Sequence, residues 1–571
     1  MMKMYLIALY ILCCCTSTLN AQDKRDIKIW IKRALADGQR RIVVPAGTWY
    51  MDLKDGTPLI LQDLSGVKII GNGVNIICNT PTQAIEIQHC ENLYISGLTI
   101  DYDPLPFTQG KIIDLDTGKR MWMDVKIYEG YRTDMIEGRL PDRLQIFDKN
   151  THNLKKNLYT YFSGSFSKVE KKSDHLFRFY KSGFNKDACE ELNDDVVFSL
   201  PYPGKTRPHT IVITRSKNVH LENITLFSGN CFGFFEMECD HNVYNHCRVT
   251  KKINDPQLSS PRLRSNNADA FHSKFAIHGP EVTNCEFLYQ GDDGIAISTS
   301  FYRVVSGKGN KIYVDAGTEK IKIGIGHQVR FVDYTGKVLE DAKVLSITST
   351  TDYPQADLEN MFHLFRMKVQ NRKTVTLLTL DKTVSATTGS VVSSLNMAGA
   401  GFIVKNNKVG YTRARGILIK SSDGVIKNNN VTGCELGGIV LEPELNWLEA
   451  GFSRNVLIQH KLVKDCMFAN SSYGIEQAAS ISVVAVNAQN KIAPSGGFMN
   501  IRIIDNTIEN SPAPAIMVTS IAGGKIVNNH ISISKDIIRS HGRRLGINNT
   551  APIWQKNTEN LLIRKNKTVN Q

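Results

Sequence analysis

The sequence predicts an all-β solenoid, a right-handed parallel β-helix with two inserted small β-barrel-like domains. Short alternating strands are broken by Gly, Asn and Asp, and no helical periodicity lies between them. A turn in which Asn precedes an apolar–any–apolar triplet recurs at a nearly constant spacing. The chain of 571 residues also exceeds the usual size of one hydrophobic core, which favours an elongated repeat.

The recurring turn defines the length of one coil. It is clearest at Asn92-Leu-Tyr-Ile, Asn218-Val-His-Leu, Asn500-Ile-Arg-Ile and Asn560-Leu-Leu-Ile. Neighbouring copies are 24 residues apart from Asn218 to Asn242, 22 from Asn407 to Asn429 and 23 from Asn506 to Asn529. Periods of this size are typical of stacked structural units. Asn at such a turn takes left-handed backbone angles and forms side-chain ladders between coils.

Two stretches break the period, 101–209 and 303–398, and each is long enough for a small inserted β-barrel. We therefore expect first coils over 22–100, middle coils over 210–302 and C-terminal coils over 399–571. Insertions on one face of a solenoid usually carry the binding site.

The first 21 residues are predicted to be a removable secretory signal that directs the protein outside the cytoplasm. Lys3 precedes an apolar run from Tyr5 to Cys15, and small residues lead to Ala21. A lipoprotein anchored through Cys13, Cys14 or Cys15 is the alternative, but no small residue of the usual kind precedes the first of them. Elsewhere no apolar run approaches the length needed to span a bilayer.

Composition narrows the classes of partner. Hydrophobic residues make up 42% and charged residues 22% of the chain, as in folded soluble proteins. The net charge of +14 is spread along the chain rather than clustered with aromatic residues, which excludes nucleic acid. No Cys-x-x-Cys spacing indicates zinc, no disulfide framework is implied, and we expect no cofactor. Homo-oligomerisation stays open.

A group of carboxylates stands out once the coils are aligned. The alignment places four apolar residues in one buried column, namely Phe271, Ile295, Ile417 and Ile439. Two residues earlier, Asp269, Asp293 and Arg415 form a second column, with Asp292 beside them. Stacked strands lie about 4.8 Å apart, so at least one carboxyl pKa should rise. A protonated acid beside an ionised carboxylate is what glycosidic-bond cleavage needs.

Two simpler interpretations apply to the same residues. Asp-Asp-Gly is a common turn, and a solvated carboxylate is the default for any single Asp in it. Three carboxylates could also bind calcium, but the alternating Asp/Asn spacing of a calcium loop is absent. The third carboxylate one coil away favours a catalytic site.

Three motifs resemble the polygalacturonase pattern of Asn-Thr-Asp, Gly-Asp-Asp and Arg-Ile-Lys blocks. They are Asn267-Ala-Asp-Ala-Phe-His, Gln290-Gly-Asp-Asp-Gly and Arg415-Gly-Ile-Leu-Ile-Lys420. Ala268 replaces the Thr, and no Gly-His block follows the second motif, so specificity for uronates is not implied. By this resemblance Asp269 and Asp293 deprotonate a water and Asp292 protonates the leaving oxygen, although the three roles can be permuted.

Longer phrases resemble glycoside hydrolase family 110. They are Leu98-Thr-Ile-Asp-Tyr-Asp-Pro-Leu-Pro-Phe-Thr-Gln-Gly110 and Gly438-Ile-Val-Leu-Glu-Pro-Glu-Leu-Asn-Trp-Leu-Glu-Ala-Gly451. That family comprises bacterial, often Bacteroides, exo-acting α-1,3-galactosidases that remove terminal galactose from blood-group-B-type glycans. The resemblance implies an inverting, metal-independent hydrolase with catalytic aspartates at Asp269, Asp292 and Asp293. We expect linear α-1,3-galactosides to be cleaved as well.

Other residues are candidates for substrate binding. Arg415 and Lys420 are predicted to hold hydroxyls or tune the aspartates, with a salt bridge to Asp293 as the alternative. His272 should face outward, to bond a sugar or simply to meet solvent. On the long turn after Glu442 and Glu444, Trp447 either stacks on galactose or packs in the core.

Glu236 and Glu238, one coil earlier, are predicted to line the cleft. An inserted barrel should close one end of the pocket, because exo action needs a closed pocket.

Two other functions remain as alternatives. A β-helix polysaccharide lyase would need cations for a uronate and a base for its α-proton, and the sequence offers few cations there. A non-catalytic glycan-binding β-helix, as in adhesins, would keep its ligand affinity in Asp292→Asn.

Overall fold

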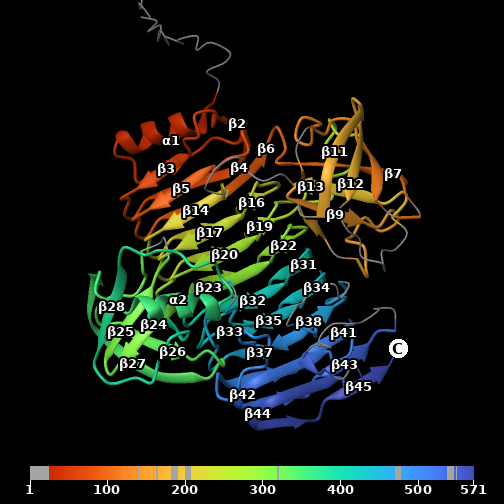
Figure 1. Cartoon of the computed structure of the whole chain (residues 1–571). Coiled ribbons are helices and arrows are strands. Elements are labelled where there is room, and N and C mark those ends of the chain that lie inside the picture. The colour runs from red at the N-terminus through yellow and green to blue at the C-terminus, as the bar shows by residue number, and fades with distance from the viewer. Residues whose placement is uncertain are drawn as a thin grey trace, which may run out of the picture.

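The computed structural model describes residues 25–570 apart from 117, 120, 138–139, 159, 163–164, 182–190, 200–207, 318–319, 446, 470–476, 536–544 and 548–549. In this part of the chain a sheet of 32 strands, 31 of them parallel, winds into a β-helix, and two antiparallel units are inserted in it. Helix α1 (Ile27–Ala36) covers the N-terminal end, from which the coils stack toward the C-terminus (Figure 1). The predicted fold class is confirmed.

Strand pairing arranges the coils in three stacks. Stack 1 contains β3 (Leu59–Gln62), β5 (Ile85–Gln88), β14 (Ile211–Thr214), β17 (Phe234–Met237), β20 (Phe271–Lys274), β23 (Ile295–Ser300), β32 (Ile417–Ile419), β35 (Ile439–Leu441), β39 (Ile481–Val483), and the first parts of β42 (Ile516–Val527) and β44 (Ile553–Arg564).

Stack 2 contains β1 (Arg41–Val43), the first parts of β4 (Lys68–Cys78) and β6 (Tyr94–Tyr102), β15 (His220–Glu222), β18 (Val243–Asn245), β21 (Glu281–Thr283), β30 (Ile403–Lys405), β33 (Val425–Lys427), β37 (Leu457–Gln459) and β40 (Phe498–Ile504), and it continues into the later parts of β42 and β44.

Stack 3 contains β2 (Gly47–Met51), the later parts of β4 and β6, β16 (Thr225–Leu226), β19 (Arg248–Val249), β22 (Glu286–Leu288), β31 (Lys408–Thr412), β34 (Asn430–Cys434), β38 (Leu462–Lys464), β41 (Thr507–Ser511), β43 (His530–Ile533) and β45 (Lys567–Asn570).

The core of the solenoid follows the predicted column. Phe271, Ile295, Ile417 and Ile439 are in register on consecutive coils, and all four are fully buried. Side chains alternate along a strand, so the residue two positions later also points inward. At that position β17 carries Glu236 and β20 carries Ser273.

The first insertion is a seven-stranded antiparallel sheet with its own core. Its strands, in the order β10-β9-β13-β7-β8-β12-β11, are β7 (Phe107–Leu115), β8 (Trp122–Ile127), β9 (Arg143–Phe147), β10 (Tyr161–Phe162), β11 (Phe166–Ser173), β12 (Leu176–Lys181) and β13 (Asp195–Ser199). We call it the inserted sheet. In Figure 1 it lies beside the middle coils.

The second insertion is a closed barrel, which we call the inserted barrel. It consists of β24 (Tyr302–Lys308), β25 (Lys311–Asp315), β26 (Gln328–Val332), β27 (Val338–Thr350), β28 (Val375–Leu380) and β29 (Val391–Ser394), with helix α2 (Gln355–Leu364) packed against it. One further short strand, β36 (Glu449–Ala450), pairs antiparallel with β23.

The predicted signal segment lies outside the described residues, so export stays a prediction. No helix in the described part of the chain is long and apolar enough to cross a membrane. The described cysteines, from Cys78 to Cys466, are buried thiols, and Cys189 lies outside the described residues.

The turn between stacks 2 and 3 contains a ladder of buried asparagines. Asn407 donates from Nδ2 to Oδ1 of Asn429 at 2.9 Å, and Asn506 does the same to Asn529. Lys461 occupies the ladder position between these pairs, because Asn430 and Leu462 are paired in register. Its Nζ is buried without a hydrogen-bond partner among the described residues, and burial together with Lys427 lowers its pKa to about 6.

Restoring the ladder should stabilise the solenoid. Lys461→Asn is expected to raise the free energy of unfolding by about 1–3 kcal/mol, because it replaces an unpartnered amine with two buried hydrogen bonds. An unfolded Lys titrates near 10.4, so the unfolded chain binds more protons between about pH 6 and 10. The free energy of unfolding of the wild type therefore rises with pH over this range. The difference in the free energy of unfolding between Lys461→Asn and the wild type should shrink accordingly. Denaturant unfolding at pH 6.5 and 9 measures both effects, and a destabilised variant at pH 6.5 would contradict the ladder argument.

Candidate active site

The stacking of the coils brings the three predicted aspartates together. The backbone N–H of Ala270 donates to the carbonyl of Asp293, and that of Gly294 donates to the carbonyl of Arg415. One carboxylate oxygen from each of Asp269, Asp292 and Asp293 lies within 4.8 Å of the others. Gly294 is required here, because a Cβ would lie 2.4 Å from the carbonyl oxygen of Gly416 on the next coil.

Asp292 is held between two arginines. Arg143 Nη1, at the start of β9 in the inserted sheet, lies 2.9 Å from Oδ2, and Arg413 pairs with Oδ1. Burial favours the neutral acid, but the charges of Arg413, Arg143 and Arg415 outweigh it and lower the pKa of Asp292 to about 2. This carboxylate is therefore ionised at neutral pH.

Asp293 has the opposite electrostatics. Burial raises its pKa to about 7, and the charges of Asp269 and Asp292 add to the rise against the opposing charge of Arg415. Arg415 contacts both oxygens, since its backbone N donates to Oδ1 at 2.8 Å and its Nη2 lies 2.8 Å from Oδ2. A raised pKa is the outcome expected for stacked like charges.

Asp269 forms a pair with His272. The Nδ1 of His272 lies 2.7 Å from Asp269 Oδ2, and its Nε2 lies 3.3 Å from Ser298 Oγ. Burial raises the pKa of Asp269, and the His272 contact reduces the rise. His272 points away from the coil interior as expected, yet it is only 7% exposed and its ring stacks on Phe232. It is therefore not a surface histidine.

Beyond the aspartates lies a row of buried charges. Arg415 makes the expected salt bridge to Asp293, and its Nη1 also lies 3.5 Å from Glu444. Lys420 is fully buried and pairs with Glu444 and Glu449. These side chains continue the charged row from Asp292 along the edge of stack 1.

One of the two glutamates predicted to line the cleft is placed differently from the prediction. Glu236 does not line the cleft, because strand alternation turns it into the coil, where it accepts hydrogen bonds from Ser273, Tyr244 and Asn242. Glu238 pairs with Lys322 of the inserted barrel at 2.6 Å, so it ties that barrel to the coil.

The turn after β35 carries the other two candidates. Glu442 is buried and accepts a hydrogen bond from Gln477 Nε2 at 2.6 Å, so this bond occupies one of its oxygens. Trp447 is 78% exposed, which excludes the alternative of a core residue.

Three residues at the site were missed from the sequence. Arg413 stands two positions before Arg415, and this Arg-x-Arg spacing was the available signal. Arg143 has no local signal, since only tertiary contact brings the inserted sheet to Asp292. Glu435, one coil after Arg413, is buried against Thr160, and burial raises its pKa to about 8 against the opposing charge of Arg413.

The aspartate group fits a metal ion poorly. Calcium takes 6–8 oxygen ligands, whereas guanidinium groups already contact both oxygens of Asp292 and one oxygen of Asp293. A second group that could hold a cation, formed by Asp240, His241 and His278, is more exposed than the aspartates.

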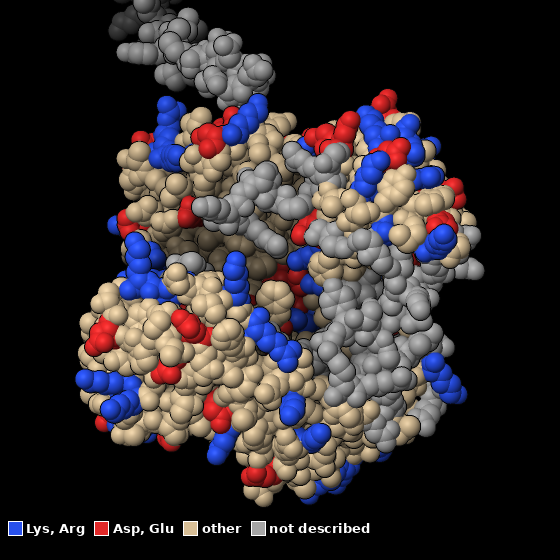
Figure 2. Space-filling model, in the orientation of Figure 1, with Lys and Arg blue, Asp and Glu red and all other residues tan. Residues whose placement is uncertain are grey.

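Figure 2 shows a hollow near the centre of one face, with acidic and basic side chains inside it.

Comparisons with known proteins give distant relatives over most of the chain. The chain is 22% identical over 512 residues to alpha-1,3-galactosidase B of Bacteroides thetaiotaomicron, covering 86% of this chain and 77% of the relative. It is 21% identical over 495 residues to alpha-1,3-galactosidase A of Bacteroides fragilis, covering 83% and 75%. No family model matches the sequence.

Among solved structures, the endo-xylogalacturonan hydrolase of Aspergillus tubingensis matches with a TM-score of 0.34 and 10% identity, covering 97% of this chain and 92% of that one. The catalytic unit of a GH87 alpha-1,3-glucanase from Streptomyces thermodiastaticus matches with a TM-score of 0.38 and 8% identity, covering 95% and 66%. The chain is therefore a parallel β-helix protein with distant sequence similarity to alpha-1,3-galactosidases.

The buried ammonium of Lys420 should be essential for stability. Lys420→Met leaves two partly buried carboxylates without their shared cation, so the free energy of unfolding should fall by about 3 kcal/mol in denaturant titrations, the lower end of the range for a broken buried pair. Glu449→Gln added to this variant should recover part of the loss, because Glu444 keeps Arg415. A loss below about 1 kcal/mol for Lys420→Met would refute the buried network.

Proposed function

We propose that this chain is an exo-acting inverting α-1,3-galactosidase that releases terminal galactose from blood-group-B-type branched glycans and from linear α-1,3-galactosides. The observation that carries the proposal is a group of three carboxylates in which one is ionised and two have raised pKa values. The named relatives support the linkage and the sugar. The specificity for branched and linear glycans comes from the family resemblance.

The electrostatics favour a different division of roles from the polygalacturonase pattern. Asp292, ionised by its arginines, is unsuited to donate a proton and suited to orient and deprotonate a water. The Asp269–Asp293 pair keeps a proton near neutral pH and can donate it to the glycosidic oxygen. Water oxygen then bonds to the anomeric carbon as the bond to the leaving oxygen breaks, and Asp292 takes the proton from the water.

The short distance between the carboxylates favours the other stereochemical outcome, retention at the anomeric carbon. The carboxylate oxygens lie within 4.8 Å, closer than the separation of about 6.5–9.5 Å typical of inverting pairs and nearer to that of retaining enzymes. A retaining route would need one aspartate as nucleophile. Arginines contact both oxygens of Asp292, and Arg415 contacts both oxygens of Asp293. These contacts lower the nucleophilicity of Asp292 and Asp293, which favours inversion. Each oxygen of Asp292 keeps a second lone pair, with which it can accept a proton from water.

The structure also changes the argument about the two alternative functions, a polysaccharide lyase and an adhesin. The expectation that few cations lie near the aspartates is wrong, because Arg143, Arg413 and Arg415 all contact them. Each of these arginines pairs with an aspartate, which leaves less positive charge for a uronate. A lyase would release an unsaturated, ultraviolet-absorbing product, and an adhesin would release no sugar.

Proton NMR of the reaction tests the proposal directly. The chain is expected to release β-galactose first from both α-1,3-galactobiose and the blood group B trisaccharide, because water attacks opposite the leaving group. First appearance of α-galactose would establish retention. Release from the trisaccharide alone would make fucose part of recognition, and no galactose from either substrate would refute the galactosidase.

Two substrates with different leaving groups distinguish the aspartate that acts as the acid from the one that acts as the base. Hydrolysis of α-galactosyl fluoride needs no acid, so Asp293→Asn should lose about 10²–10⁴-fold in kcat/KM on the disaccharide and much less on the fluoride. Asp292→Asn should lose activity on both substrates. The kcat/KM of wild type on the disaccharide should fall above about pH 7, where the acid loses its proton.

The matched control is Glu435→Gln, a buried carboxyl next to Arg413 that the mechanism does not use. If Asp292→Asn instead kept activity on the fluoride and Asp293→Asn did not, the two roles would be the reverse of those proposed.

A further inference from the structure

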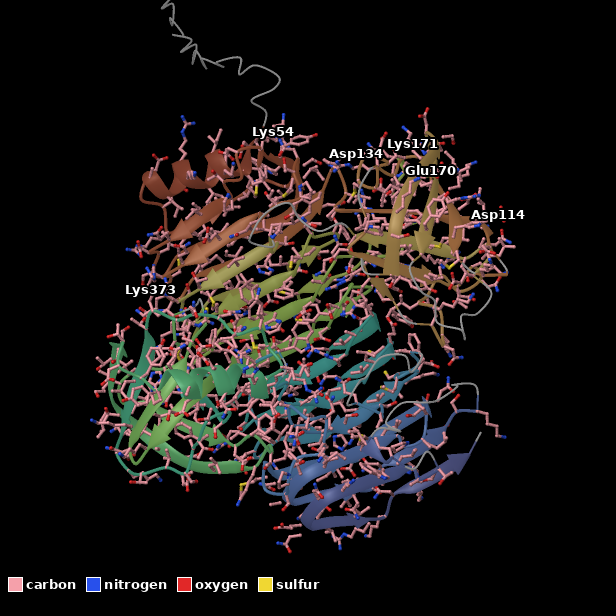
Figure 3. All side chains as sticks on the ribbon, in the orientation of Figure 1. Lys54, Asp114, Asp134, Glu170, Lys171 and Lys373 are labelled. Carbon is pink, nitrogen blue, oxygen red and sulfur yellow. The ribbon has the colours of Figure 1, made fainter. Side chains whose placement is uncertain are left out.

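A cavity separate from the aspartates lies between the first coils and the inserted sheet. Its volume is about 330 Å³, within the range of small-molecule sites. Tyr50 of β2, Asp103 after β6, Tyr131 and Arg132 of the inserted segment, and Lys252 and Gln257 after β19 line it. Figure 3 shows Asp134, the ion-pair partner of Arg132, on the side of the inserted sheet that faces these coils.

The walls of this cavity are rigidly built. Buried Arg262 donates to both oxygens of Asp101 at 2.8 and 2.9 Å and to Asp255 at 2.5 Å. The segment 251–264 is fixed to the inserted sheet, because Ser259 N donates to the carbonyl of Glu129. Gly130 (φ +84°) permits this contact, since a Cβ there would lie 2.2 Å from the carbonyl oxygen of Gln257. A preformed cavity of this kind binds with little ordering cost.

The chemistry of the cavity suits a neutral polyhydroxyl ligand. Asp101 and Asp255 are balanced by Arg262 and by Lys252, whose Nζ lies 3.9 and 3.5 Å from them. Arg132 is paired with Asp134, and Asp103 adds a further carboxylate, so no lining cation is left over to select an acidic group. Tyr50 is 55% exposed, and an exposed aromatic ring packs against the apolar face of a sugar. The buried Nε of Arg262 has no hydrogen-bond partner among the described residues.

The cavity and the aspartates lie along one edge of the solenoid. Phe227 N donates to the carbonyl of Ile100, Asn267 N to that of Gly229, and Gly291 N to that of Asn266. Each bond joins neighbouring coils, so Asp101 and Asp292 are three coil spacings, about 14 Å, apart along the axis of the solenoid. This distance corresponds to a few sugar units of an extended glycan.

We propose that this cavity is a remote subsite for the neutral oligosaccharide that carries the terminal galactose. The inference rests on the proposed function. Terminal galactose occupies the aspartate site, and a sugar further along the same glycan contacts Tyr50, Arg132 and the segment 251–264. The subsite adds affinity for long glycans, and a disaccharide does not reach it.

Kinetics on two substrates with the same terminal linkage test the subsite. Wild type is expected to have a KM for a neutral oligosaccharide of four or more sugars at least fivefold below its KM for α-1,3-galactobiose. The double variant Tyr50→Ala/Arg132→Ala removes this difference by raising the KM of the long substrate, while kcat on that substrate changes less than twofold. The matched control is Tyr180→Ala/Lys168→Ala, an aromatic–cation pair on β11 and β12 at the far edge of the inserted sheet.

A binding measurement separates failure of the subsite from failure of the proposed function. Calorimetry with the oligosaccharide lacking its terminal galactose should detect binding to wild type and to Asp293→Asn, and at least fivefold weaker binding to Tyr50→Ala/Arg132→Ala. Binding without any hydrolysis would refute the galactosidase and keep the glycan site. Equal KM values for both substrates in wild type, equal effects of the test and control variants, or binding unaffected by Tyr50→Ala/Arg132→Ala would overturn the subsite.

Discussion

Backbone hydrogen bonds between coils fix the distance between equivalent residues at one strand spacing, and the chemistry of the site depends on this constraint. Asp269 and Asp293 stand on consecutive coils and cannot move apart without breaking the bond from Ala270 to Asp293. Two carboxylates held this close in a buried position cannot both ionise at ordinary pH. At least one of the two carboxyls therefore stays protonated, and glycosidic-bond cleavage needs a protonated acid of this kind.

The inserted sheet contributes to the ionisation of that edge. Arg143 reaches Asp292 from the first strand position of β9 and, with Arg413, keeps this carboxylate ionised. Glu238 and Lys322 join the inserted barrel to the same region of stack 1. The repeat supplies the carboxylates, and the inserted sheet supplies a charge that separates their pKa values. In the proposed mechanism, activity therefore depends on the packing of the inserted sheet against the coils.

The same stacking rule explains the buried polar residues away from the site. Glu236 occupies an inward position, and three donors satisfy its carboxylate, so the core tolerates it. Lys461 occupies a ladder position that asparagine fills on the coils around it, and its amine has no partner in the described chain. Glu236 is stabilised by the hydrogen bonds of its neighbours, whereas Lys461 destabilises the repeat locally.

The sequence by itself determined the fold and the column of aspartates, because both follow from a period in which each coil repeats the same positions. It located Asp269, Asp292 and Asp293 for that reason, and it predicted the salt bridge of Arg415 to Asp293 as one of two alternatives. Only the tertiary structure decided that Arg143 contacts Asp292, that Lys420 lies between two glutamates, and that His272 is buried beside Asp269. The contacts of Arg143 and Lys420 join an inserted segment and a long turn to the coils, and a periodic pattern carries no information about segments outside its period. The burial of His272 depends on Phe232 of the preceding coil, whose ring stacks on it.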